Sequence, residues 1–183
     1  ERDLLALRDA TEEAHKKRGD LALLILGLAE VRLLTPEEVV KRAPNPNIRL
    51  QKVGQIEDQE VLRWLATTDK SERVRRAAFD RISNQDTLYQ AIMRSWLNHH
   101  REYMDHIHRL TIQDNLVDVA LRLHNLQAQS AAVLRLFNLH HQEGLAEVVI
   151  AKGEDHNTPS PAVREEACKL VIVPEQLLRI FHQ

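Results

Sequence analysis

Two histidines and a glutamate are spaced so that they could act together as metal ligands. His99, Glu102 and His106 stand at i, i+3 and i+7, so on a helix their side chains would share one face. Imidazole nitrogens and a carboxylate suit zinc or iron. A structural zinc site needs a full tetrahedral ligand set, however, and no cysteine lies nearby to complete it. Capping or solvated histidines are the preferred interpretation, so we expect no metal or cofactor, and metal binding by residues 99–108 stays open as the alternative.

The single cysteine, Cys168, is the other side chain with reactive chemistry. It falls where the helical pattern described below expects an apolar side chain, so we expect a buried hydrophobe and not a nucleophile. One cysteine excludes an internal disulfide and fits a reducing compartment, and we therefore expect a cytoplasmic protein.

A cluster of arginines is the best nucleic-acid feature of the chain. Arg73, Arg75, Arg76 and Arg81 lie close together, but the one aromatic residue among them, Phe79, falls at a predicted core position. The formal net charge of -2 and the pI near 6.6 give no general attraction to phosphates. We therefore interpret the cluster as a solvated helix face, and nucleic-acid binding remains an alternative function.

These side chains must be positioned by helices, because Leu, Ala, Arg and Glu predominate and only five glycines are present. A short motif recurs six times: an apolar residue, Gln or Pro three positions later, an acid directly after it, and Leu or Val two positions beyond. The Gln/Pro positions, which we call the column, are 36, 59, 85, 113, 142 and 174. Their spacing of 23 to 32 residues is typical of repeat proteins.

Each repeat is predicted to contain two antiparallel helices, A and B. Helix A begins near the caps Asn45, Ser71 and Ser160 and ends before the column. Helix B begins at the column and buries its positions +3, +6 and +7. The predicted fold is an all-α, single domain over 1–183, a solenoid of about six helix pairs. The expected units lie near 20–43, 45–68, 71–95, 99–124, 128–151 and 160–183, after a leading helix 1–18.

Residues 69 to 92, DKSERVRRAAFDRISNQDTLYQAI, resemble a HEAT-like (armadillo-type) helical repeat in their Val-Arg, Ala-Ala and following Leu. Residues 45–66 and 160–181 match less completely. The resemblance implies a right-handed superhelix that serves as a non-catalytic binding scaffold. It also implies that Arg49, Arg75 and Arg164 pair with acids in the neighbouring turn.

Two HEAT-like enzyme classes offer alternatives. Deoxyhypusine hydroxylases bind iron through His-Glu pairs, and this sequence contains no His-Glu dipeptide. Alkylpurine DNA glycosylases use aromatic residues and an aspartate beside a basic surface, whereas Trp64 and Trp96 here accompany an acidic row. We therefore expect no enzymatic activity, with a DNA-glycosylase-like or a His-rich metal-dependent enzyme as alternatives.

The B helices are predicted to turn positions +1, +5 and +8 away from the core. The HEAT-like resemblance implies that this is the concave side of the solenoid. An exposed strip there would hold a protein or peptide partner, with apolar contacts flanked by acids. The same apolar side chains would be ordinary core if neighbouring helices covered them, and both interpretations remain open. The partner-binding residues of this hypothesis are Trp64, Tyr89, Met93, Val117, Leu121, Ile150, Asp86, Asp114 and Glu143.

The chain begins without methionine and ends shortly after Pro174, so we expect a fragment of a longer protein. No apolar run reaches membrane-spanning length, and no signal peptide is recognised. Residues 151–161 form the longest predicted inter-repeat loop. The partner and the oligomeric state do not follow from the sequence.

Overall fold

The computed structural model describes residues 35–98, 101–151 and 158–181. These residues form eleven helices and no strand, which confirms the all-α fold class for the described part of the chain. The predicted leading helix 1–18, the first A helix and the centre of the loop 151–161 lie outside the described residues.

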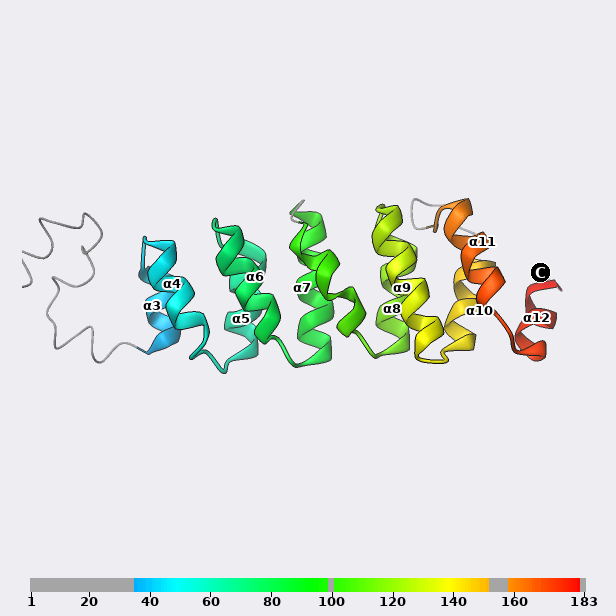
Figure 1. The fold of residues 1–183 in the computed structure, drawn as a ribbon, viewed down its shortest axis with the longest axis horizontal. Coiled ribbons are helices and arrows are strands. Elements are labelled where there is room, and N and C mark those ends of the chain that lie inside the picture. Colours follow the sequence, from blue (N-terminus) through cyan, green and yellow to red (C-terminus); the bar gives the residue numbers. More distant parts are fainter. Residues whose placement is uncertain (1–34, 99–100, 152–157, 182–183) are drawn as a thin grey trace, which may run out of the picture.

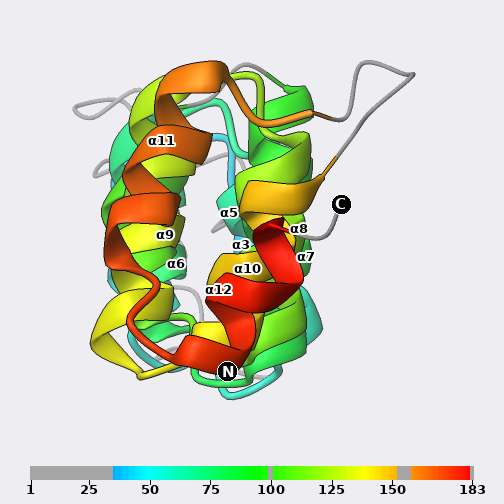
Figure 2. The same cartoon turned by 90° about the vertical axis from the view of Figure 1, so that its right-hand side faces the viewer.

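The helices form two layers that run side by side along the molecule (Figures 1 and 2). One layer holds the B helices: α3 (Pro36–Arg42), α5 (Gln59–Thr68), α7 (Gln85–Leu97), α8 (Gln113–Arg122), α10 (Gln142–Ile150) and α12 (Pro174–Phe181). The other holds the A helices: α4 (Pro46–Val53), α6 (Glu72–Arg81), the 3-10 helix η1 (Glu102–Arg109), α9 (Leu126–Asn138) and α11 (Pro161–Leu170). Helices α3, α5, α7, α8 and α10 each contact the A helix that follows in the chain. Neighbours within a layer also touch, from α4 onward in the A layer and from α5 onward in the B layer.

All six B helices begin at the Gln or Pro predicted from the motif. Thr35 and Glu38 form the predicted capping box before α3, and Asp58 and Asn84 accept backbone N–H groups at the starts of α5 and α7. Each cap satisfies donors that the first helical turn leaves free. The sequence therefore determines where this layer begins each of its helices.

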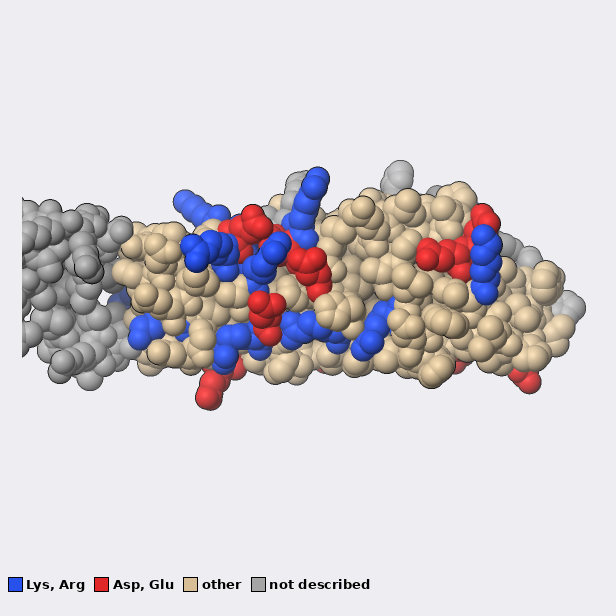
Figure 3. Space-filling view, viewed as in Figure 1, with Lys and Arg blue, Asp and Glu red and all other residues tan. Residues whose placement is uncertain are grey.

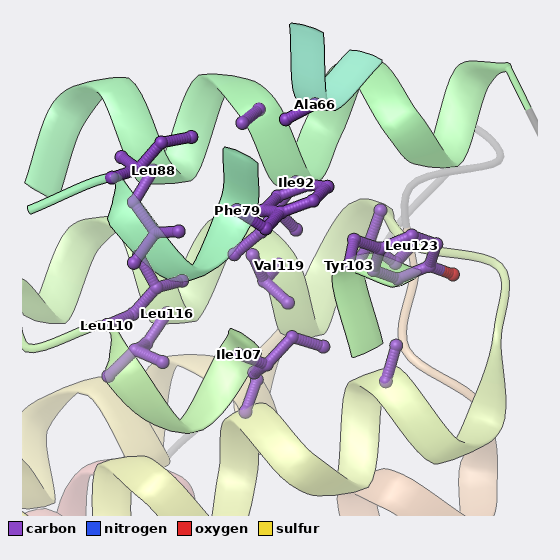
Figure 4. Packing of buried hydrophobic residues seen from close by; sticks show 14 of the residues in the cluster. Ala66, Phe79, Leu88, Ile92, Tyr103, Ile107, Leu110, Leu116, Val119 and Leu123 are labelled. Carbon is purple, nitrogen blue, oxygen red and sulfur yellow. The ribbon is translucent and has the colours of Figure 1, made fainter. Parts of the chain in front are cut away.

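The core lies between the two layers (Figure 4). Phe79, Ile92 and Val119 point toward one another from α6, α7 and α8, and all three are fully buried. The predicted core positions +3 and +6 are buried in α5, α7, α8 and α10. Burial of these apolar faces is the main force that holds otherwise short helices in place.

The element after α7 differs from the prediction. An A helix was expected from His99, but the structure has a 3-10 helix, η1, that begins at Glu102. Its residues include Tyr103, Ile107 and two histidines, all weak helix formers, and its N-cap, Arg101, makes no side-chain capping bond. The chain therefore takes the tighter i to i+3 turn over this short stretch.

The prediction that Cys168 is buried was wrong, because its side chain is exposed on α11. Val163 and Ala167 are the residues that α11 buries. The other side chains six before the column face the next A helix, and no described A helix follows α11.

Candidate partner-binding surface

Trp64 stands beside a hollow near the end of the B layer that holds α3. The hollow has a volume of about 640 Å³ and lies between the C-terminal ends of α3 and α5 and the starts of α4 and α6. The indole is 40% exposed, which is high for the largest apolar side chain. The other lining residues are Val40, Lys41, Ala43, Pro44, Pro46, Arg49, Thr68, Asp69, Lys70 and Ser71. Lys41, Pro44 and Trp64 were all predicted to point outward.

An ion pair braces the wall of this hollow. Arg49 Nε and Nη2 donate to the Asp69 carboxylate at 2.7 and 2.9 Å. Its Nη1 donates to the carbonyls of Ala43 and Pro44, at 2.7 and 2.9 Å. Four of the five guanidinium N–H groups are therefore used. The side chain ties the α3–α4 turn to the start of α6, and its partner Asp69 is an acid of the neighbouring turn, as the resemblance implied.

The free charge beside Trp64 is positive. Lys41 and Lys70 are exposed, and neither forms an ion pair within the described residues. The Asp69 carboxylate is already neutralised by Arg49. A ligand in the hollow would therefore meet an apolar indole flanked by two ammonium groups.

The predicted strip continues from Trp64 in a less exposed form. Tyr89, Met93, Leu121 and Ile150 are half-buried. Tyr89, Met93 and Leu121 also pack against the core, so each shows only part of its side chain to a partner. These side chains are thus neither fully exposed, as the partner-binding hypothesis expects, nor fully buried, as ordinary core residues would be.

Val117 does not belong to this strip, because it is only 7% exposed. A Cβ placed on Gly144 of α10 would lie 3.0 Å from Val117 Cγ2. The glycine lets α10 approach α8 closely, and the helix contact covers Val117. The prediction that Val117 is available to a partner was therefore wrong.

The acids of the predicted strip are exposed but separate. Asp86, Asp114 and Glu143 each occupy the second residue of a B helix, where the helix dipole favours negative charge. Glu143 also lies 3.8 Å from Arg179 of α12. The three carboxylates form an acidic edge of the layer and do not converge on one point.

A hydrogen bond crosses the strip between α7 and α8. The Tyr89 hydroxyl donates to Asp118, which also pairs with Arg122 at 2.6 Å. Burial and this hydrogen bond raise the pKa of Tyr89 to about 12. The Tyr89 phenol therefore stays protonated, and its hydrogen bond to Asp118 fixes the spacing of α7 and α8.

The column glutamines have a role that the sequence reasoning missed. Gln59 Oε1 accepts the backbone N–H of Ser83 at 2.8 Å, and Gln142 Oε1 accepts that of Ile172 at 2.8 Å. Gln85 accepts from Thr111 and donates to the Arg109 carbonyl. Each bond joins the start of one B helix to the turn before the next. The recurrence of Gln at one column was the signal that could have revealed it.

The arginine cluster is only partly solvated. Arg75 forms an ion pair with the buried Glu102, and Arg81 donates to the Ile56 carbonyl at 3.1 Å. Arg76 lies 3.5 Å from Glu72 and close to a second acid. Figure 3 shows the basic side chains over α6 and its neighbours interleaved with acidic ones. This face therefore lacks a uniformly basic patch.

The candidate metal ligands are engaged in packing. The Glu102 carboxylate accepts from Arg75, and the His106 ring stacks on Phe79 with centroids 4.8 Å apart and planes 7° apart. His99 lies outside the described residues. In the segments that the structure describes, no three His, Cys, Asp or Glu side chains are placed to hold a metal ion.

No protein-family model, curated protein or solved structure matches this chain. Within the described ranges, no helix is both long and apolar enough to cross a bilayer. A proposal for the function therefore rests on the geometry of the chain itself.

Proposed function

We propose that this chain is a non-catalytic, HEAT-like α-solenoid that binds a peptide segment of a protein partner along its B helices. The order of the helix contacts supports the solenoid, because all the larger contacts between described helices join near neighbours in the chain. The right-handed superhelix is part of the same proposal.

The observation that carries the proposal is the exposure of Trp64 beside a hollow of about 640 Å³. An exposed tryptophan in a preformed hollow is the usual anchor point of an interface, because it buries a large apolar area at little cost in conformational entropy. Half-buried Met93 and Leu121 extend the apolar surface along the same layer.

The charges indicate how the partner would lie. Its apolar side chain would occupy the hollow, and an acidic residue next to it would meet Lys41 and Lys70. Basic residues further along would face Asp86 and Asp114, which form no ion pair among the described residues. Such charges set orientation and specificity more than affinity.

Selection of peptides from a displayed library on the intact chain tests this function. Selected peptides should bind with micromolar affinity, and Trp64→Ala should weaken them at least ten-fold, as expected for an aromatic anchor. Leu134→Ala is the matched control, because Leu134 is 46% exposed on α9 of the other layer. Equal loss in both variants, or no loss with Trp64→Ala, would exclude the hollow as the binding site.

A second experiment tests the rest of the strip. Met93→Glu with Leu121→Glu should weaken peptide binding while the circular dichroism spectrum stays helical. Collapse of the fold would show that both side chains are core and not binding surface. The salt dependence separates the alternative function, since nucleic-acid binding through arginines would weaken steeply with salt and an apolar contact would not.

A further inference from the structure

The free polar side chains around the Trp64 hollow are hydrogen-bond donors. Lys41 and Lys70 line the hollow, are exposed, and form no ion pair or hydrogen bond within the described residues. The indole N–H of Trp64 is also unbonded there, and the hydroxyl of Ser71 makes no capping bond to α6. Ammonium groups and an indole nitrogen can only donate, and a hydroxyl can donate as well as accept.

The acceptors that border the same hollow are already occupied. The carboxylate oxygens of Asp69 accept from Arg49 at 2.7 and 2.9 Å, and Oδ1 also accepts the Ser71 backbone N–H at 2.8 Å. Nη1 of Arg49 donates to two backbone carbonyls, and Nη1 of Arg75 donates to two more. These carbonyls belong to Ala43, Pro44, Asp69 and Lys70.

A ligand in the hollow therefore finds donors and no lining carboxylate or side-chain amide that is free to accept. The Asp69 side chain is only 3% exposed, so a ligand does not compete with Arg49 for it. The polar part of a fitting ligand must consequently be rich in acceptors. Its apolar part would lie against the exposed indole of Trp64.

The charge around the hollow is positive, although the formal net charge of the whole chain is -2. Lys41 and Lys70 each add an unpaired positive charge, whereas the Arg49–Asp69 pair adds none. The acids of α3 and α5 stand in the first turns of these helices, and the hollow lies at their last turns. A group with two negative charges would balance the two ammonium groups.

We propose that the segment bound at Trp64 carries a phosphorylated serine or threonine next to its apolar anchor, and that the phosphate binds Lys41 and Lys70. A phosphate carries about -1.5 to -2 charges at pH 7 and three strong acceptor oxygens. A carboxylate has one charge and two oxygens, so it would leave one ammonium group unmatched. The inference rests on the proposed peptide binding and adds that the partner is recognised in its phosphorylated state.

The occupant is a modified segment of a partner and not a second copy of the chain. An unmodified copy offers only carboxylates, each with a single charge. The donors of the hollow are matched better by a group that phosphorylation adds. Binding would thus be controlled by a kinase and a phosphatase that act on the partner.

Two degenerate peptide libraries test this inference on the intact chain. One library has phosphoserine fixed at its centre, and the other has serine there. The best phosphopeptide is then resynthesised with serine or glutamate at that position, and its affinity is measured by fluorescence anisotropy. The phosphoserine form should bind about ten-fold more tightly than the serine form, as for one charge-assisted hydrogen-bonded contact. The glutamate form should fall between them.

Substitutions in the chain locate the phosphate. Lys41→Gln with Lys70→Gln should abolish the preference for phosphoserine and leave the affinity for the serine form nearly unchanged. Both lysines are exposed, so the circular dichroism spectrum should not change. Lys169→Gln is the matched control, since this lysine of α11 has a side chain that is 70% exposed and lies outside the hollow. Trp64→Ala should weaken the phosphoserine and serine forms alike, because both use the anchor.

The outcomes separate this inference from the function on which it rests. Equal affinities of the phosphoserine and serine forms, both reduced by Trp64→Ala, would overturn the phosphate inference and leave the proposed function standing. A phosphoserine preference that survives the double lysine substitution would overturn the inference as well. If no peptide from either library depends on Trp64, both proposals fall. Self-association of the chain alone, lost in the double lysine variant, would make the hollow a contact between copies and also overturn the inference.

Discussion

His106 shows how a residue that looks like a ligand in the sequence can be a packing element in the structure. Its ring is 4% exposed and lies flat against Phe79. Burial lowers the pKa of His106, and so does Arg109, whereas Asp80 and Asp105 oppose the shift and His108 adds to it. Nε2 lies 3.9 Å from Asp80, too far for a hydrogen bond. The native state therefore favours the neutral imidazole more than the unfolded chain does.

Stability should consequently fall in mild acid. The unfolded chain binds a proton at His106 near pH 6.5 and the native state binds it only at lower pH, so the native state loses free energy of unfolding as the pH drops below 6.5. The slope from this residue is at most about 1.4 kcal/mol per pH unit. Urea unfolding between pH 7.5 and about 5 measures it.

The matched variants isolate the histidine. His106→Phe keeps a flat ring against Phe79 and should flatten the pH dependence, whereas His108→Gln, at an exposed site of the same helix, should not. A wild-type slope that persists in His106→Phe would assign the acid sensitivity to other groups.

At the scale of helices, the periodic signals in the sequence were sufficient for the B layer and insufficient for part of the A layer. Caps and the Gln/Pro column predict the first residue of all six B helices. The element η1 was not predicted, because weak helix formers and the lack of a side-chain cap favour the tighter 3-10 turn there, and the six-fold motif carries no signal for that turn. The burial of Val117 could not be predicted from the sequence either, since it depends on how closely α10 approaches α8.

That close approach makes Gly144 a test of helix packing. A Cβ at this position would meet Gln113 Cγ at 2.9 Å, and Leu136 Cδ2 and Val117 Cγ2 at 3.0 Å. Leu136 and Val117 are buried and cannot easily move, so Gly144→Ala should destabilise the chain by about 1–3 kcal/mol despite the better helix propensity of alanine. The urea midpoint measures the change.

Gly54 provides the control. It ends α4 with φ of -60°, and a Cβ there would meet nothing within 4 Å. Gly54→Ala should therefore stabilise the chain by about 0.4–1 kcal/mol, because alanine has less freedom to lose on folding. Equal effects of the two substitutions would mean that the α8–α10 contact tolerates a methyl group.

At the scale of the molecule, hydrogen bonds and ion pairs connect one A or B helix to the next, and the sequence predicted only the arginine part of this pattern. Arg109 and Arg135 donate to carbonyls of the preceding turns, to Ile82 and Leu110. These contacts depend on how the helices are placed in space, which the order of residue types does not reveal. Whether an apolar side chain lies at the surface, like Trp64, or in the core, like Val117, is likewise decided by how closely the neighbouring helices approach it.

A molecule joined in this local way should lose structure first in the helix that is least buried. Helix α12 buries no residue, and among the described helices α10 is the one that packs substantially against it. Helix α8, in contrast, contacts α7, α9 and α10. Amide hydrogen exchange should therefore be fastest in α12, slower in α10 and slowest in α8.

Leu177→Ala should speed exchange in α12 alone, because Leu177 is only half-buried. Leu116→Ala, at a fully buried site of α8, should cost about 2–5 kcal/mol and speed exchange on both sides of it. Equal protection factors in α8 and α12 would instead show that the whole row unfolds as one cooperative unit.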